Sequence, residues 1–171
     1  MSDLDDHLDR VLIGGRQPVL VELAEPDPSW PRLFEEHRDR ILAALGPAEI
    51  DHVGSTSVPG LAAKPIVDVQ VVVPDLEAAV EPLVAAGYVL RVREEGHRVL
   101  KGEPPANVHL YLPGDPEIEA HLRFRDLLRT DPEARRRYEE LKRSLAGRVW
   151  PDMNHYAEAK GPLIRELLRG Q

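Results

Sequence analysis

Apolar and polar positions alternate along this chain in patterns that predict both helices and strands. Apolar residues recur every three or four positions over 30–45, which predicts a helix, and Gly46-Pro47 ends it. Residues 18–23 alternate between apolar and polar positions, as an edge strand does. Residues 66–73 are β-branched and almost wholly apolar, a composition typical of a strand that is buried on both faces.

The rest of the chain divides into a region of short strands and a region of helices. Further strands are predicted at 48–53, 88–93, 97–101 and 107–112, and further helices at 76–86, 116–130, 132–148 and 152–169. Short turns join the last three strands, so we expect an antiparallel meander. The pattern therefore predicts an α+β core over 18–112 and a helical C-terminal layer over 116–169. Residues 1–17 are an acidic leader, either a packed helix or a frayed end, and without a linker we expect one domain over 1–171.

Composition and charge exclude several classes of protein. The chain has 171 residues, no cysteine and a formal net charge of −8. Without cysteine it has no disulfide and no thiolate nucleophile, and no apolar run approaches the ~20 residues of a membrane span. The N-terminal MSDLDDHLDR lacks the basic start of a secretory signal, so we expect a cytoplasmic protein. The acidic balance argues against duplex nucleic acid as a partner, but it allows a small basic pocket for one anionic ligand.

The segment from Gly54 to Ser57 carries residue types that bind phosphate. Gly54 lets a ligand approach the backbone closely. The successive amides of Gly54, Ser55, Thr56 and Ser57 can form a concave anion site, and three hydroxyls add donors to it. Lys64 can supply a point charge from the same loop. The alternative is that Gly-Ser-Thr-Ser is an ordinary turn.

Asp68 interrupts the otherwise apolar strand at 66–73. A charge at such a position is unfavourable unless it is paired, hydrogen-bonded or bound to a metal. Strand alternation places Asp68 and Gln70 on one face. Because Mg²⁺ prefers carboxylate and phosphate oxygens, Asp68 facing the hydroxyl-rich loop is what a magnesium–nucleotide site needs. The alternative is a structural carboxylate that is hydrogen-bonded to backbone.

The string HVGSTSVPGLAAKPIVDVQVVV, which begins at His52, resembles the GrpB family, also called UPF0157. The resemblance continues through His109-Leu110, the stretch 121–129 and Tyr156 with Lys160, and it covers about residues 19–168. It implies a nucleotidyltransferase-like fold of the DNA polymerase β type, a mixed sheet flanked by helices. It also implies a domain that is sometimes fused to dephospho-coenzyme A kinase.

The nucleotidyltransferase pattern is only partly present in this chain. Gly54-Ser55 fits its start and Asp68 fits its first carboxylate, but Gln70 stands at the second. The strand expected to carry a third carboxylate, 107–112, has only Asn107, His109 and Tyr111 as polar side chains. Two-metal phosphoryl transfer uses carboxylates to bridge both ions. The resemblance therefore implies at most one Mg²⁺, held by Asp68.

Histidines offer a different way to complete the site. His52 precedes the Gly-Ser turn and His109 lies on the last strand of the meander. Together with Asp68 they would form a two-histidine, one-carboxylate set, which binds Zn²⁺, Mn²⁺ or Fe²⁺. The alternative is that each histidine hydrogen-bonds a neighbouring group.

Basic residues are placed to draw an anionic ligand toward the bend. Arg98 and Lys101 lie on the middle strand of the meander, and Arg125 shares a helix face with Arg129. Lys142 and Lys160 lie on the two following helices, although a surface position explains Lys160 equally well. In a negatively charged protein, basic residues that converge on the Ser55 loop would focus an anion there. We expect Arg98, Lys101 and Arg125 to bind the ligand.

Three hypotheses for function follow from these residues. The first is Mg²⁺-dependent transfer of a nucleotidyl or phosphoryl group, with catalysis by positioning and charge stabilisation. The second is a catalytically degenerate protein that binds a nucleotide or another phosphate ligand. The third is an accessory domain for protein interaction, as in the fusions to dephospho-coenzyme A kinase.

Overall fold

The centre of the molecule is a five-stranded mixed sheet. We describe residues 2–170 of a computed structural model. The strand order is β2-β3-β6-β5-β4, with bounds β2 Glu49–Val53, β3 Val67–Val72, β6 Ala106–Tyr111, β5 His97–Gly102 and β4 Val89–Glu94. β3 and β6 run parallel, whereas the other neighbouring pairs are antiparallel. The predicted antiparallel meander and the α+β class are therefore confirmed.

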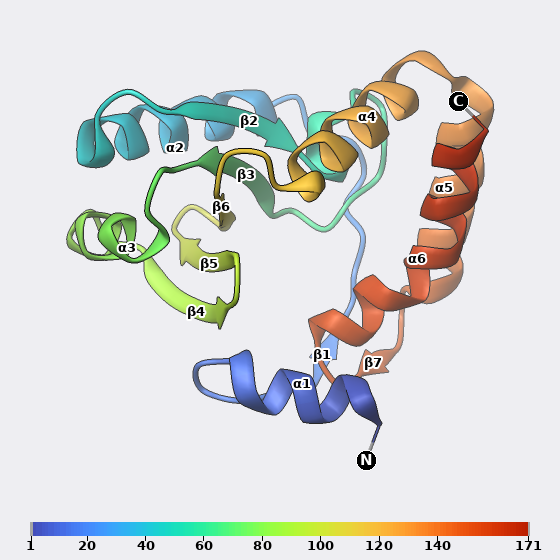
Figure 1. Ribbon diagram of the computed structural model, residues 1–171. Helices are drawn as coiled ribbons and strands as arrows, with labels where there is room; N and C mark the ends of the chain where they lie inside the picture. The colour runs from blue at the N-terminus through green and yellow to red at the C-terminus, as the bar shows by residue number, and fades with distance from the viewer. Residues whose placement is uncertain (1, 171) are drawn as a thin grey trace.

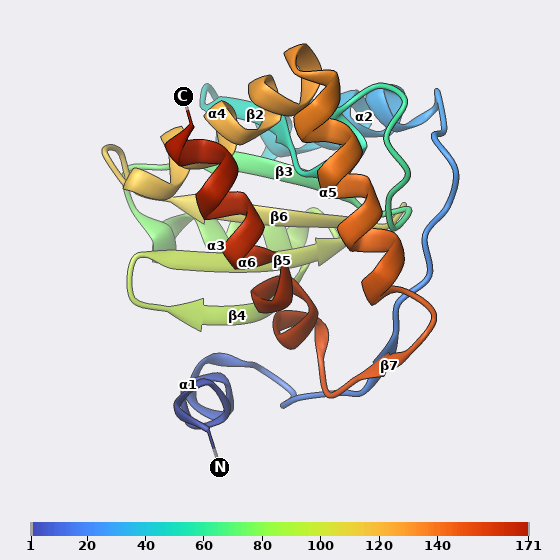
Figure 2. The same cartoon turned by 90° about the vertical axis from the view of Figure 1, so that its right-hand side faces the viewer.

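Helices lie on both sides of this sheet (Figure 1). One side carries α2 and α3, and the other carries α4, with α5 and α6 in front of the strands when the sheet is viewed face on (Figure 2). The bounds of these helices are α2 Trp30–Leu45, α3 Leu76–Ala85, α4 Pro116–Thr130, α5 Pro132–Leu145 and α6 Met153–Arg169. The helix α1 (Asp3–Val11) lies next to β4, where Ile13 donates its amide to the carbonyl of Arg91.

Two hydrophobic clusters hold these layers together. The larger lies between the sheet and the pair α2 and α3, and the alternate residues Val67, Val69 and Val71 of β3 all point into it. The smaller joins the loop after β2 to the C-terminal helices, through contacts of Val58 and Leu61 with residues of α4 and α5. The loop that contains Gly54 and Ser55 is thus anchored to the helical layer as well as to the sheet.

The predicted elements correspond closely to the observed ones, with differences that tertiary pairing explains. The helices predicted at 30–45 and 116–130 are α2 and α4. The strand predicted at 18–23 is reduced to β1 (Val19–Leu20), which pairs with β7 (Val149–Trp150). The helix α5 ends at Leu145, before the predicted boundary, and Gly147 then donates its amide to the carbonyl of Val21 next to β1. The leader is a helix, whose first turn is capped by Ser2 and Asp5.

In residues 2–170 no helix combines the length and the apolar character that crossing a membrane requires.

Candidate functional site

The bend after β2 and the carboxylate of β3 meet directly. Val53 pairs with Asp68 in the antiparallel register, and Gly54 then turns the chain across β3 with a φ of 73°. A Cβ atom on Gly54 would lie 3.1 Å from the Cβ and Cγ atoms of Asp68, and even closer to Oδ2. Only glycine accommodates both this φ and this approach. The sequence-based prediction that the bend faces Asp68 therefore describes the observed geometry.

Asp68 is held in an ionised state by its neighbours. Its Oδ1 accepts a hydrogen bond from Asn107 Nδ2 at 3.2 Å and lies 3.3 Å from His109 Nε2. Burial opposes ionisation, but His109, Lys64 and Asn107 outweigh it and hold the pKa of Asp68 below its ordinary value. The side chain is 29% exposed. Within residues 2–170 no hydrogen-bond donor reaches Oδ2, the oxygen that lies next to Gly54.

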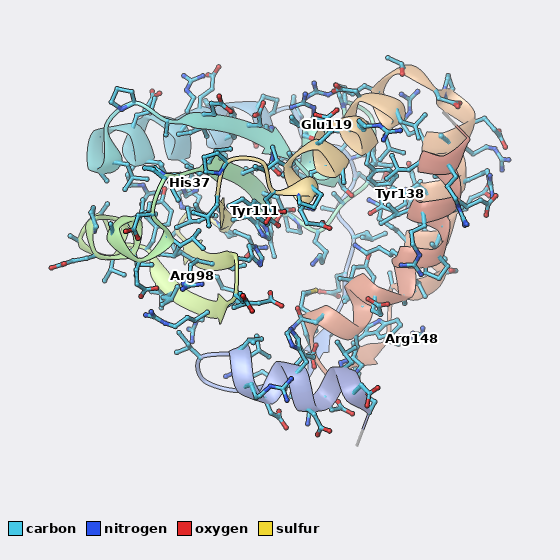
Figure 3. The ribbon with its side chains drawn as sticks, in the orientation of Figure 1. His37, Arg98, Tyr111, Glu119, Tyr138 and Arg148 are labelled. Carbon is cyan, nitrogen blue, oxygen red and sulfur yellow. The ribbon has the colours of Figure 1, made fainter. Side chains whose placement is uncertain are left out.

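A small cavity opens next to the bend. Its volume is about 150 Å³, and its lining comes from the bend, α4, α5 and α6: Gly54, Ser55, His121, Phe124, Arg125, Leu128, Tyr138 and Ile164. Ser55 is half-buried and lines this cavity together with Tyr138 of α5. Figure 3 shows Tyr138 on the side of the molecule away from α2 and α3. Sequence reasoning did not identify Tyr138, because its helical spacing fits a core residue equally well.

Thr56 and Ser57 do not offer their side chains to a ligand, which corrects the prediction for both. The Thr56 hydroxyl lies 2.9 Å from His52 Nε2, and the Ser57 hydroxyl donates to the carbonyl of Gly54 at 2.5 Å. Both residues are buried in a short 3₁₀ turn, η1 (Ser55–Ser57). Of the three hydroxyls in the bend, only that of Ser55 lines the cavity.

His52 lies on the opposite face of the sheet from Asp68. It pairs with Val69 in the register, and its ring stacks on Phe34 of α2 with ring centroids 4.8 Å apart. Burial lowers the pKa of His52 to about 4. Within residues 2–170 no group of three or more His, Cys, Asp or Glu side chains is placed to hold a metal. The predicted set of His52, His109 and Asp68 therefore does not form.

Arg98 is also on the wrong face, and the prediction that it binds the ligand is corrected. It pairs with Leu110 of the core, and its guanidinium contacts Glu77 of α3 at 2.9 Å. Figure 3 shows Arg98 close to α3. Lys101 pairs with Asn107 instead, and so it projects from the face that carries Asp68. Because the two basic residues are three positions apart on one strand, they must point in opposite directions.

Arg125 and Arg129 hold the bend in place. Arg125 Nη1 donates to the carbonyl of His52 at 3.2 Å and lies 3.5 Å from Asp51 Oδ1. Arg129 donates to the carbonyl of Ser57 through Nε at 2.9 Å and through Nη2 at 2.8 Å. With these carbonyls bonded from α4, the bend keeps its position over Asp68. Arg125 also lines the cavity, where its charge can reach a ligand.

Gln70 uses its amide for structure. Its Nε2 donates to the carbonyl of Ile118 at 3.3 Å, and its Oε1 accepts from His121 Nδ1 at 2.9 Å. Gln70 therefore connects α4 to the sheet. It occupies the position of the second carboxylate in the nucleotidyltransferase pattern. His109, at the third position, contacts His97 Nε2 at 3.2 Å in addition to Asp68. Asp68 is the one carboxylate at these three positions, so the residue types fit one Mg²⁺ and lack the bridging carboxylates of a two-metal site.

Comparison with known proteins places the chain among close relatives. It matches the family described as GrpB protein over residues 20–170. It is 46% identical over 158 residues to a UPF0157 protein of Streptomyces coelicolor, covering 90% of this chain and 85% of that one. A dephospho-CoA kinase of Mycolicibacterium paratuberculosis is 35% identical over 184 residues, which cover 87% of this chain but only 45% of the kinase.

Two solved structures resemble this chain in fold. The crystal structure of the conserved protein GrpB from Enterococcus faecalis superposes with a TM-score of 0.71 at 31% identity, covering 87% of this chain and 98% of that one. The MgGTP-bound Cid1 poly(U) polymerase superposes with a TM-score of 0.50 at 11% identity, covering 80% of this chain and 45% of that one. The second likeness shows a shared nucleotidyltransferase-like fold.

Proposed function

The chain belongs to the GrpB family, and from the geometry of its site we propose that it binds a nucleotide or another small ligand with a phosphate group. The phosphate would lie against the bend at Gly54 and Ser55, and Asp68 would hold one Mg²⁺ ion that neutralises part of its charge. The observation that carries this proposal is the contact between the Gly54 backbone and the Asp68 carboxylate next to a cavity lined by Ser55.

The groups of the bend have separate tasks in this proposal. The Ser55 hydroxyl and the backbone amides beside Gly54 bind phosphate oxygens, as backbone concavities do elsewhere. Arg129 holds the bend through the Ser57 carbonyl, and Asn107 orients the Asp68 carboxylate. When bound, the magnesium ion supplies neutralisation of phosphate charge. Asp68 Oδ2 is the protein atom that would hold it.

Binding without nucleotidyl transfer is the form of this function that the site supports best. Two-metal transfer requires carboxylates that bridge two ions. Gln70 is committed to α4 and His109 is committed to Asp68 and His97, so neither can replace a missing carboxylate. An accessory role in longer proteins is a second candidate, favoured by the dephospho-CoA kinases that contain a related segment.

Ligand-dependent thermal stability tests the proposal. We expect MgATP or MgGTP to raise the melting temperature of the parent protein, because a ligand that binds only the folded form stabilises it. Asp68→Asn should lose the magnesium-dependent part of this rise, and Ser55→Ala should weaken binding about tenfold, the effect of one hydrogen bond to a charged group. Asp39→Asn, an exposed change on α2, is the matched control.

Two results would contradict the proposal. One is a parent protein whose melting temperature neither a nucleotide nor an inorganic phosphate changes at millimolar concentration. The other is an Asp68→Asn variant that binds MgATP as well as the control does. Release of labelled product from an α-labelled nucleotide measures transfer separately: no release supports binding alone, and steady release shows a transferase.

A further inference from the structure

The lysines of this protein are distributed differently from its arginines. Of its 22 basic residues only four are lysines, and they come from four separate parts of the chain: Lys64, Lys101, Lys142 and Lys160. Many arginines pair with carboxylates on the surface, as Arg136 does with Glu133 at 2.6 Å. Within residues 2–170 no lysine forms an ion pair with a carboxylate. This is unusual in a chain with an excess of acidic residues, and the lysines therefore require an explanation.

All four lysines gather between the sheet and the C-terminal helices. Lys64 Nζ lies 5.3 Å and Lys160 Nζ lies 4.5 Å from the centre of the Tyr156 ring, so one aromatic ring carries two ammonium groups. Burial and the charges of Lys160 and Lys101 lower the pKa of Lys64 to about 8. Burial and the charge of Lys160 lower the pKa of Lys142 to about 7. The lysines thus repel one another across a common space.

The groups around the Tyr156 ring lack oxygen acceptors, unlike Lys142, which donates to the carbonyl of Ala62. Among residues 2–170, the one hydrogen-bond partner of Lys64 Nζ is the sulfur of Met153, at 2.8 Å, and thioether sulfur is a weak acceptor. Lys160 Nζ has no hydrogen-bond partner within residues 2–170. The hydroxyl of Tyr156, a residue that is only 1% exposed, is buried without a partner. Buried donors are normally satisfied, so a buried hydroxyl without a partner, together with two partly buried ammonium groups that no oxygen accepts from, points to a ligand with several acceptor oxygens.

Glu139 faces Lys142, and the acid that faces Lys64 and Lys160 is Asp68. It raises the pKa of both Lys64 and Lys160, but it stays outside ion-pair distance. Two carboxylates therefore face a group of four cations, and the excess positive charge is costly while it is partly buried. A ligand with a single phosphate would engage the bend at Ser55 and leave most of these cations uncompensated.

We infer that Lys64, Lys160 and Tyr156 bind a chain of phosphate groups, a diphosphate or longer, that extends from the bend at Ser55 between the sheet and α6. The exposed Lys101 and the buried Lys142, which donates to the carbonyl of Ala62, add positive charge near these residues. The inference rests on the proposed phosphate site and narrows its ligand to nucleoside diphosphates, triphosphates and other condensed phosphates.

Inorganic anions of increasing length test this inference without a nucleoside. Calorimetry should measure orthophosphate, pyrophosphate and tripolyphosphate binding to the parent protein, without magnesium and then with it. We expect affinity to rise at least tenfold from orthophosphate to tripolyphosphate. Lys160→Met should remove most of this gain and leave orthophosphate binding nearly unchanged. Arg165→Met, an equal loss of charge at an exposed position of α6, should retain the gain.

Tyr156→Phe separates a ligand role from a structural one. Removing a buried hydroxyl that has no partner should leave the melting temperature unchanged or raise it, and it should weaken tripolyphosphate binding several-fold. Equal affinities for the three anions, or equal losses in Lys160→Met and Arg165→Met, would overturn the inference even if MgATP binds through Ser55 and Asp68. Lysine-dependent tripolyphosphate binding without any nucleotide binding would support the inference and overturn the nucleotide part of the proposed function.

Discussion

The two faces of the five-stranded sheet are built from the same strands but contain opposite kinds of residue. One face packs on α2 and α3 through Val69, Leu100 and Leu110, which are fully buried. The other face carries Asp68 and Lys101 and lies toward the C-terminal helices. Strand alternation alone assigns neighbouring residues to these two environments. The first face stabilises the fold, and the second accepts unfavourable burial of charge in order to present a site.

This difference teaches how the protein separates stability from function. Apolar burial contributes roughly 25 cal/mol for each Å² removed from water, and the face toward α2 and α3 is where that contribution is made. Between the other face and the C-terminal helices, buried cations such as Lys142 and the unpaired hydroxyl of Tyr156 reduce stability. Substitutions on the two faces should therefore have opposite consequences for folding and for binding.

The largest expected effect comes from a pair of adjacent residues on β5. Leu100→Ala should reduce the free energy of unfolding by ~2–5 kcal/mol, because it leaves a cavity in the core. Lys101→Ala should change it by less than ~0.5 kcal/mol, because the side chain is exposed. Urea unfolding measures both values. Tripolyphosphate binding should show the reverse order: the affinity should be lower in Lys101→Ala than in folded Leu100→Ala. Equal losses of stability in the two variants would contradict the difference between the two faces of the sheet.

A smaller effect concerns pH. The Lys142 pKa is lowered from 10.5 to about 7 by burial and by Lys160, so between these values the unfolded chain binds a proton that the folded protein has lost. Stability must then rise with pH over this range, by roughly 1 kcal/mol across the first pH unit above 7. Below pH 7 the lysine is charged in both states, and its full burial penalty remains.

Lys142→Met isolates the contribution of Lys142 to the pH dependence of stability. Its free energy of unfolding, measured by urea titration at several pH values, should lack the rise that begins near pH 7, whereas the rise due to Lys64, whose pKa is about 8, should remain. The slope of the free energy of unfolding against pH is the informative quantity, because loss of the hydrogen bond to Ala62 shifts the free energy equally at every pH. A variant with the parent's slope would show that Lys142 does not titrate in this range.

The smallest expected effect is that of Arg98, on the face toward α3. Arg98→Gln breaks the ion pair with the half-exposed Glu77, and exposed pairs of this kind contribute ~0.2–1 kcal/mol. Phosphate binding should not change, because the side chain points away from Asp68. Calorimetry with tripolyphosphate checks this, and a tenfold loss of affinity would restore Arg98 to the site.

Much of the fold and the centre of the site could be predicted from the sequence. Local patterns located α2 and α4 accurately, and an acid within an apolar strand identified Asp68 as unusual. The prediction for Arg98 failed although alternation along β5 already separated it from Lys101. The metal-ligand prediction for His52 failed for the same reason, because His52 lies on the opposite face of the sheet from Asp68. The predictions for Thr56 and Ser57 failed for a different reason. Their polar groups are satisfied by residues that the bend itself brings together, and no periodicity reveals such pairing.

The sequence by itself determined the alternation of the strands, the glycine that lets the chain cross Asp68, and the absence of a second and third carboxylate. These properties depend on residue type and near neighbours, which the chain order fixes. Only the tertiary structure decided that Lys64, Lys142 and Lys160 share one space around Tyr138 and Tyr156. The reason is that α5 and α6 reach the sheet through contacts between residues far apart in the chain, and charge interactions depend on distance in space.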